Sequence, residues 1–307
     1  MWSYSIRRLL GAIPTLFIIV TLTFFVMRIA PGGPFDSEQS PPPQIRANLE
    51  AAYGLDQPVH VQYLRYLQGL MHGDFGPSFR YRDFTVTELI RQGLPVSLTL
   101  GLAALVLAIG LGVPLGVWAA VRHDRPVDHV LRAIAILGIA LPSLVIAPLL
   151  ALVFGIKLRW LPVGGWDSGS VRTLILPVLA LALPLIAFVS RLTRASMLEV
   201  LTSGFIRTAR AKGMPERIVI MRHALRPALL PVVSYLGPAT AAVLTGSLVV
   251  ETLFNIPGMG RYLVQGALNR DYTLVMGVVI VYATLTLAMN LLVDLLYGVL
   301  DPRIRHE

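Results

Sequence analysis

The sequence predicts an all-α membrane protein with six transmembrane helices, and two observations carry that prediction. Hydrophobic residues make up 55% of the 307 residues and charged residues only 14%, against roughly 25% charged in ordinary soluble domains. The charges are also unevenly spread, because six stretches of at least 18 residues contain no Asp, Glu, Lys or Arg. A soluble protein of this length could not cover its surface with so few polar groups. The composition therefore excludes a soluble enzyme and a disordered chain.

The six charge-free runs define the expected spans, because a helix needs about 20 apolar residues to cross a bilayer core of about 30 Å. The first run follows Arg7 and Arg8 like a signal peptide, but it is too long for one and no small-x-small cleavage site follows. We interpret it as an uncleaved span. The runs are Leu9–Met27, Gln92–Val121, Ala133–Ile156, Thr173–Ser190, Pro227–Val250 and Tyr272–Val293.

The distribution of Lys and Arg predicts that both termini lie in the cytoplasm, since short cytoplasmic loops carry the excess of basic residues. With the N-terminus inside, fifteen of the 26 basic residues fall on the cytoplasmic side: Arg7, Arg8, Arg122, Arg125, Arg132, Arg191, Arg194, Arg207, Arg210, Lys212, Arg217, Arg222, Arg226, Arg303 and Arg305. The two short outside loops hold five: Lys157, Arg159, Arg172, Arg261 and Arg270. The other six lie at Arg28 and in the long segment after it, which this rule weights little.

Three parts follow from this topology. Residues 1–93 form the first transmembrane helix and a small helical periplasmic cap, which is too short to have an independent core. Residues 94–297 form a five-helix core, which includes a cytoplasmic loop at 191–226. Residues 298–307 form a cytoplasmic tail.

The cytoplasmic loop at 191–226 holds eight of the basic residues and only two acidic ones, Glu199 and Glu216. Ser203 is a suitable N-cap for a helix over Gly204–Lys212, and Gly213 suits the C′ position with φ > 0. Phe205, Ile206 and Ala209 fall on one side of that helix and form its apolar side. One interpretation is an amphipathic stretch that rests on anionic lipid headgroups; the other is a docking element for a protein partner.

Catalytic and cofactor motifs are absent from the sequence. There is no phosphate-binding loop, no Gly-x-Ser-x-Gly and no His-Glu-x-x-His. Cysteine is absent, and the six histidines are scattered through the non-spanning segments, so we expect neither a disulfide nor a metal site. The net charge of +9 is not accompanied by the clusters of Arg, aromatic residues and Gly that are typical of nucleic-acid binding. We therefore expect no catalytic site, no cofactor in this chain and no nucleic-acid partner.

The cytoplasmic loop resembles the EAA loop of ABC-importer membrane subunits. The residues that carry the resemblance are Phe205-Ile206-Arg207-Thr208-Ala209-Arg210-Ala211-Lys212-Gly213 and Arg222-His223-Ala224-Leu225-Arg226-Pro227. Arg207-Thr208-Ala209 stands in the place of Glu-Ala-Ala, Gly213 keeps its spacing, and Pro227 comes one residue late. Members of the peptide and nickel branch of the family typically lack this Glu, so its absence here indicates that branch.

Motifs along nearly the whole chain resemble the membrane subunits of bacterial oligopeptide/dipeptide ABC importers, and most closely the B-type subunit of oligopeptide permeases. The matching segments are Arg7–Leu9, Ile13–Leu16, Arg28–Gly32, Gly54–Pro58, Gln62–Tyr63, Gly73–Ser78, Glu251–Gly260, Asn269–Tyr272, Val293–Tyr297 and Asp301–Arg303. Each motif alone is modest, but their order over the full length is specific.

The resemblance implies the type I ABC-importer fold in the bacterial inner membrane and a function in importing short peptides. It implies a homologous membrane subunit that forms a heterodimer with this chain, one or two cytoplasmic ATPase subunits that bind ATP-Mg, and a periplasmic or lipid-anchored peptide-binding protein. The EAA-like residues Phe205, Ile206, Arg207, Thr208, Ala209 and Gly213 would then couple the chain to the ATPase. A loop that contains Glu251, Pro257, Gly258 and Gly260 would lie near the periplasmic mouth of the path.

Alternatives to oligopeptide import remain open at this point. The same machine could carry dipeptides, glutathione, murein peptides or a nickel chelate, because in this family the binding protein largely sets selectivity. A stand-alone channel or secondary carrier is the rival from another class. The absence of ionisable residues from all six runs argues against it, since ion-coupled carriers usually have such residues in their spans.

Overall fold

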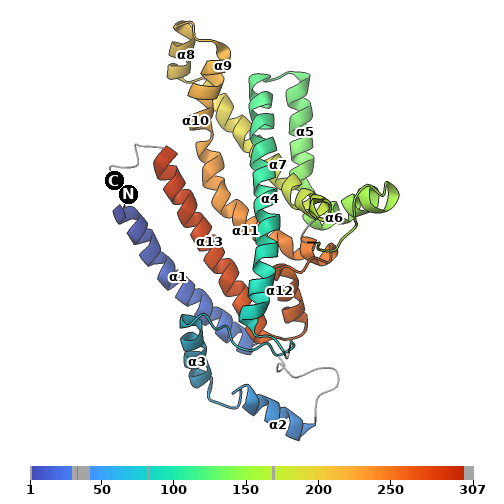
Figure 1. Cartoon of the computed structure of the whole chain (residues 1–307). Helices are drawn as coiled ribbons and strands as arrows, with labels where there is room; N and C mark the ends of the chain where they lie inside the picture. The colour runs from blue at the N-terminus through green and yellow to red at the C-terminus, as the bar shows by residue number, and fades with distance from the viewer. Residues whose placement is uncertain (1, 30–32, 34–41, 82, 168–169, 301–307) are drawn as a thin grey trace. The chain divides into compact units, whose positions relative to one another are not determined.

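The chain is almost entirely helical (Figure 1) in the computed structural model, which describes residues 2–29, 33, 42–81, 83–167 and 170–300. Within those residues the only pairing of extended backbone is an isolated antiparallel bridge between Pro77 and Thr85. The predicted all-α class is therefore confirmed. Ala30, Pro31 and Gly32 of the matching segment Arg28–Gly32 lie outside the described residues, as do residues 301–307 of the predicted tail, which include the matching segment Asp301–Arg303.

The helices occur in the following order, where η marks a π-helix: α1 Trp2–Ile29, α2 Pro43–Ala52, α3 Val59–Met71, α4 Val86–Val121, α5 Pro126–Ala140, α6 Ser143–Leu150, η1 Ala151–Lys157, α7 Val171–Leu201, α8 Gly204–Ala211, α9 Glu216–Ile218, η2 Val219–Ala224, α10 Leu225–Ala228, α11 Leu230–Leu253, α12 Met259–Leu268 and α13 Tyr272–Leu300.

Four of these helices are long and apolar enough to cross a membrane over their described residues: α1, α4, α7 and α13. Helix α5 and the continuous α6–η1 segment meet the same test as a bent pair, which raises the number to at most five. The predicted run at 227–250 lies largely in α11, which has 24 residues and would be about 36 Å long at 1.5 Å per residue. The full count of six stays a prediction.

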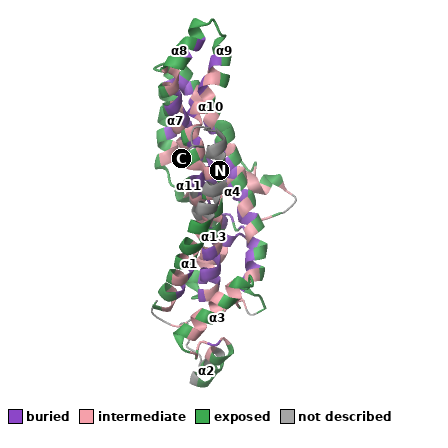
Figure 2. Ribbon diagram, turned by 90° about the vertical axis from the view of Figure 1, so that its left-hand side faces the viewer, coloured by how far each residue is buried: buried purple, intermediate pink, exposed green. Residues whose placement is uncertain are grey.

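Helix α1 has the surface expected of a lipid-facing span. Only 11% of its apolar window is buried within the chain, and exposed residues follow one another along it (Figure 2). Leu10, Ile13 and Leu22 are about 60% exposed. In water such a surface would be an aggregation hazard, whereas in a bilayer it faces a solvent as apolar as itself.

The predicted span at 133–156 is not one straight helix. Helix α5 ends at Ala140, and the next helical segment leaves at an angle of 103° to it. Pro142 explains the break, because proline disfavours helical backbone at the residue before it. Leu141 accordingly has extended angles, φ −85° and ψ 117°. The segment is either a broken span or a re-entrant loop.

The described chain divides into two compact units by packing. Unit 1 comprises Met1–Leu9, Leu98–Ile256 and Thr286–Glu307, and unit 2 comprises Leu10–Ser97 and Pro257–Leu285. Packing thus groups the predicted cap with a segment near the C-terminal end of the sequence. The predicted division of the chain into residues 1–93, 94–297 and 298–307 is not tested by this packing and stays a prediction.

Helix α7 is the centre of unit 1, where it packs against α5, α6 and α11. Helix α4 approaches it so closely at Gly116 that a Cβ there would lie 2.5 Å from the Ser190 carbonyl oxygen and 2.6 Å from Thr193 Cβ. Small residues allow such close backbone approach between membrane helices. A larger side chain at Gly116 would force α4 and α7 apart.

In unit 2, helix α3 lies against the second half of α1. The ring of Tyr63 packs edge to face on Phe24, with 5.2 Å between centroids. The Tyr63 hydroxyl is 2.7 Å from Thr21 Oγ1, and Arg28 Nε donates to Gln62 Oε1 at 3.1 Å. Part of the segment after the first span is therefore ordered by packing on that span, as its small size requires.

Candidate coupling site

Helix α8 begins and ends as local rules predict, with one exception. Ser203 precedes it with extended angles, and the Ser203 carbonyl accepts the Arg207 N–H at 3.2 Å. Its hydroxyl makes no cap, however, because it donates to the Val200 carbonyl at 2.6 Å. The helix closes at Ala211, and Gly213 follows with φ +76°. The predicted left-handed position of Gly213 is confirmed.

The buried side of α8 belongs to the core of unit 1. Ile206 is 0% exposed and Ala209 is 7% exposed. They join a buried cluster drawn from α4, α7, α8, η2 and α10, whose other members are Ala120, Met197, Val219, Ala224 and Ala228. The expectation that Phe205, Ile206 and Ala209 together form a docking surface is therefore wrong for two of the three. The reason is tertiary: residues further along the chain cover that side.

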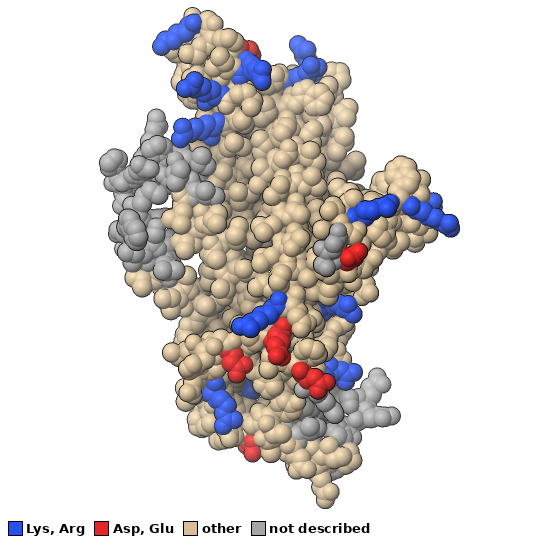
Figure 3. All heavy atoms as spheres, viewed as in Figure 1, with Lys and Arg blue, Asp and Glu red and all other residues tan. Residues whose placement is uncertain are grey.

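The exposed side of α8 is basic and includes one large apolar group. Phe205 is 52% exposed, and Arg207 and Thr208 are exposed as well. Lys and Arg side chains gather over the end of unit 1 that carries α8 and α9 (Figure 3). Of the predicted coupling residues on α8, Phe205, Arg207 and Thr208 are the exposed ones, and we call these three the α8 outer face.

An ion pair closes the turn after α8. Arg210 donates through Nη2 to Glu216 Oε1 at 2.6 Å and through Nε to Oε2 at 3.2 Å. The guanidinium lowers the pKa of Glu216, and the carboxylate raises the pKa of Arg210. Both side chains are about half exposed, so the pair orders the turn and adds little stability.

A buried ion pair between α5 and α7 lies in the same unit, and the sequence analysis missed it. Arg194 Nε donates to Asp128 Oδ1 at 2.6 Å, and Arg194 Nη2 donates to Asp128 Oδ2 at 2.7 Å. Asp128 is 0% exposed. Asp128 lies between two charge-free runs, Arg194 lies shortly after a third, and the two residues are 66 positions apart. Nothing local in the sequence links them.

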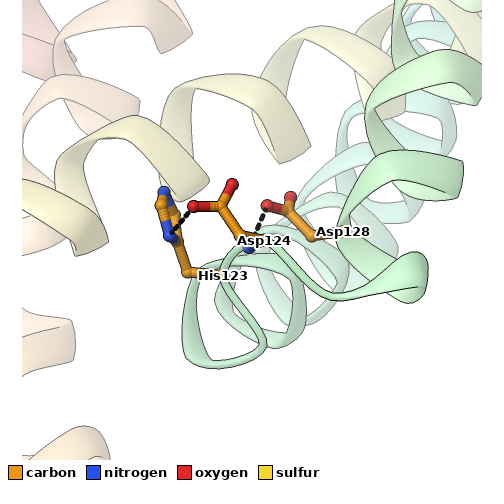
Figure 4. Close-up of side chains that lie close together, drawn as sticks. All are labelled: His123, Asp124 and Asp128. Atoms are coloured by element: carbon orange, nitrogen blue, oxygen red, sulfur yellow. Dashed lines mark hydrogen bonds and ion pairs between the residues drawn. The ribbon is translucent and has the colours of Figure 1, made fainter.

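His123, Asp124 and Asp128 lie close enough together that their ligand atoms could hold a metal ion (Figure 4). His123 Nδ1 lies 3.0 Å from Asp124 Oδ2, and Asp128 Oδ2 accepts the Asp124 N–H at 3.1 Å. Both Asp128 oxygens already accept bonds from Arg194, whose positive charge would repel a cation. The group therefore does not support a metal site.

The second predicted site, Glu251–Gly260, forms a packed turn in two parts. In unit 1, Glu251 and Ile256 are fully buried, and the Phe254 carbonyl accepts the Gly165 N–H at 2.7 Å. In unit 2, Pro257 is half-buried, Gly258 and Gly260 are buried, and the Met259 N–H donates to Ser97 Oγ at 2.8 Å. Phe254, Ile256 and Met259 of this segment are buried within the chain, whereas Leu253 is exposed. A position at the mouth of a path stays a prediction for Glu251, Pro257, Gly258 and Gly260.

Two of the matching motifs meet around one buried carboxylate in unit 2. Asp271 is 0% exposed, and its Oδ2 accepts the Ser78 hydroxyl at 2.5 Å and the Arg80 N–H at 3.2 Å. Its Oδ1 accepts the Leu274 N–H at 3.2 Å. The Thr273 hydroxyl lies 3.1 Å from the same oxygen and donates to the Pro77 carbonyl at 2.6 Å. Asp271 thus stabilises the start of α13 and the Gly73–Ser78 turn together. We call Ser78, Arg80, Asp271, Thr273 and Leu274 the Asp271 cluster; Ser78 and Asp271 are 193 positions apart.

Comparison with known proteins covers the whole chain. Residues 112–306 match the family described as the binding-protein-dependent transport system inner membrane component, and residues 1–101 match the N-terminal family of the same membrane components. Several curated relatives align from end to end.

The oligopeptide transport system permease protein OppB of Salmonella typhimurium is 53% identical over 306 residues, which is 100% of both chains. Its namesake in Haemophilus influenzae is 50% identical over the same span. The dipeptide transport system permease protein DppB of Bacillus subtilis is 43% identical over 305 residues, 99% of this chain and 98% of its own. This chain is thus a multi-pass inner membrane protein, and it belongs to the family of inner membrane components of binding-protein-dependent transport systems.

Proposed function

We propose that this chain is a permease subunit of an ATP-driven importer that moves short peptides, oligopeptides in the first instance, into the bacterial cytoplasm. The observation that carries the proposal is end-to-end identity of 50 to 53% with permeases named for oligopeptide transport. The α8 outer face supports it, because a buried anchor holds a short helix while its other side presents Phe205, Arg207 and Thr208 to a partner.

The partners we propose are those that such a machine requires. A homologous membrane subunit would form a heterodimer with this chain, and one or two cytoplasmic ATPase subunits would bind ATP-Mg and dock at α8. A periplasmic or lipid-anchored binding protein would deliver the peptide. The chain itself would hold no cofactor and would make or break no covalent bond.

The proposed topology places both termini and α8 in the cytoplasm and the cap outside. The chain has no cysteine, so single cysteines report position directly. A membrane-impermeant thiol reagent applied to intact cells should label Gln68→Cys and leave Thr202→Cys unlabelled. Both residues are exposed, so a cysteine that is not labelled must be one that the membrane separates from the reagent. Labelling of Thr202→Cys from outside would reverse the orientation.

The decisive experiment is reconstitution. The chain and the subunits that co-purify with it should take up a radiolabelled tripeptide into proteoliposomes only with binding protein and ATP. The chain alone should neither transport nor hydrolyse ATP. Uptake by the chain alone, without ATP, would replace this proposal with a secondary carrier or channel. If uptake requires ATP and the binding protein as expected, competition by dipeptides, glutathione, murein peptides and a nickel chelate would define the cargo.

A further inference from the structure

Unit 2 contains a cavity of about 200 Å³ whose walls are both aromatic and charged. It lies between α1, α3, the Gly73–Phe79 segment and the start of α13. Tyr53 and Phe79 pack edge to face on its wall, with 5.0 Å between ring centroids. Arg28, Arg65 and Asp74 also line it. Most small-molecule sites combine apolar walls with a few placed polar groups in this way.

The two guanidinium groups of the cavity are bonded to neutral acceptors. Arg28 donates through Nε and Nη2 to Gln62 Oε1, at 3.1 and 2.5 Å. Arg65 Nη2 donates to Gln57 Oε1 at 3.0 Å. Among the described residues neither guanidinium has a carboxylate within ion-pair distance. With Asp74 as the one carboxylate of the described lining, the cavity keeps an excess of positive charge.

Gln62 is held so that its oxygen faces Arg28. Its Nε2 donates to the Leu55 carbonyl at 3.1 Å and to the Gln57 carbonyl at 2.7 Å. The ring of Phe24 supports the same guanidinium from another side, with Arg28 Cζ 4.1 Å from the ring centroid. Arg28 is thus oriented in advance, which lowers the entropy that binding an anion would cost.

Tyr66 supplies an unsatisfied donor beside these charges. Its side chain lines the cavity, and its hydroxyl is buried without a hydrogen-bond partner among the described residues. Burial also raises the pKa of Tyr66, so the hydroxyl keeps its proton. Leaving such a group unpaired in a buried position is unfavourable, because it has lost its hydrogen bond to water. An oxygen acceptor that entered the cavity would replace that bond.

We propose that this cavity binds the C-terminal residue of a peptide, with the carboxylate at Arg28 and Arg65 and the side chain against the aromatic wall. The inference rests on the proposed function and adds a substrate subsite to it. Planar guanidinium groups match a carboxylate. The volume lies below the roughly 300–1,000 Å³ of sites for drug-sized ligands, so the cavity receives one end of a peptide.

The test uses the full chain in nanodiscs of phosphatidylcholine and two probes, Ala-Ala-Phe and its C-terminal amide, with binding measured by calorimetry. The free acid should bind about tenfold more tightly than the amide, which corresponds to about 1.4 kcal/mol. Arg28→Gln and Arg65→Gln should each remove that preference. Arg80→Gln is the matched control, since Arg80 is exposed and does not line the cavity; it should keep the preference.

Tyr66→Phe separates binding from folding. It removes an unpaired buried hydroxyl, so the thermal midpoint should stay the same or rise while the preference for the free acid falls severalfold. Equal binding of acid and amide to the wild type would overturn the subsite. So would retention of the full preference by both arginine variants. Neither result would touch ATP-driven uptake, which tests the proposed function separately.

A lipid phosphate is the other source of an anion. Nanodiscs that contain phosphatidylglycerol, examined by native mass spectrometry, distinguish it. The subsite predicts that Arg28→Gln leaves the number of retained phosphatidylglycerol molecules unchanged. Loss of a retained lipid in that variant, together with displacement of Ala-Ala-Phe by the same lipid in the wild type, would assign the cavity to lipid and overturn the peptide subsite.

Discussion

Helix α8 in unit 1 is held in place by apolar contacts, whereas the Asp271 cluster in unit 2 is held together by polar contacts. Ile206 and Ala209 anchor α8 through apolar contacts, and the polar residues of α8 remain outside. In the Asp271 cluster the polar groups are inside and satisfy one another. An apolar anchor leaves a surface free to bind a partner, whereas a closed polar network fixes a shape and offers nothing outward. The proposed coupling role therefore suits α8, whereas Asp271 suits a structural role.

The largest expected effect comes from a charge placed in the α8 anchor. Ile206→Asp buries an unpaired carboxylate where the side chain is 0% exposed, at a cost of several kcal/mol. We expect α8 to detach, the 202–216 segment to become sensitive to protease, and both ATPase binding and uptake to be lost. Phe205→Asp is the neighbouring control: it should leave protease resistance unchanged. Equal sensitivity of the two variants would show that α8 has no anchored side.

Removing the carboxylate at the centre of the Asp271 cluster should have the next largest effect. Asp271→Ala removes the carboxylate that accepts from the Ser78 hydroxyl and from the Arg80 and Leu274 N–H groups, and we expect a loss of about 3 kcal/mol. The Thr273 hydroxyl keeps the Pro77 carbonyl as its acceptor. Asp271→Asn keeps one acceptor oxygen and should cost about half as much by the same reasoning. Thermal unfolding in detergent measures both. An unchanged midpoint for the alanine variant would remove Asp271 from its structural role.

The end of α8 tests backbone conformation alone. Gly213 has φ +76°, and no atom lies within 4 Å of a Cβ built there. Gly213→Val should therefore cost about 1–2 kcal/mol through conformation and should weaken coupling by changing where the chain leaves the helix. Gly204→Ala is the control, because that site is equally open and its φ is not positive. Uptake per ATP hydrolysed should fall only for the valine variant; an equal effect of both would point away from the backbone.

The smallest expected effect is that of pH on the turn after α8. Arg210 lowers the folded-state pKa of Glu216, so the pair stabilises the turn above the unfolded pKa and is lost as pH falls through the lowered one. Because both side chains are about half exposed, the change should stay below about 1 kcal/mol and shrink with salt. Proteolysis between Ala211 and Glu216 should accelerate at acid pH in the wild type. Glu216→Gln should show no such dependence on pH. An equal acceleration of proteolysis in the wild type and the variant would show that the Arg210–Glu216 pair is not the cause.

Features that depend on neighbouring residues were predictable from the sequence. The α8 boundaries and the left-handed Gly213 follow from capping rules, and the helical class follows from charge-free runs. Pro142 lies inside the predicted span at 133–156, but the 103° bend at that point was not predicted. A proline predicts a break, but packing against other helices sets its angle.

Features that depend on distant contacts were not predictable. The covering of Ile206 and Ala209 involves residues from other helices, including Met197 and Ala224, so the pattern of α8 alone suggested a docking surface. The Asp128–Arg194 pair and the Ser78–Asp271 bond join positions 66 and 193 apart. Both motifs of the Asp271 cluster were visible in the sequence, but nothing in either indicated that they meet.

The assignment of coupling to the α8 outer face is tested most directly by crosslinking from Phe205. A photoreactive amino acid at position 205, in the complete transporter, should crosslink to an ATPase subunit, and the crosslink should depend on the nucleotide bound. The same group at Met221, which is exposed to a similar degree at 57% but lies outside α8, provides the control. Efficient crosslinking from Phe205 to the ATPase, above that from Met221, is the predicted result. Absence of any such crosslink in a transporter that still couples ATP hydrolysis to uptake would contradict the assignment.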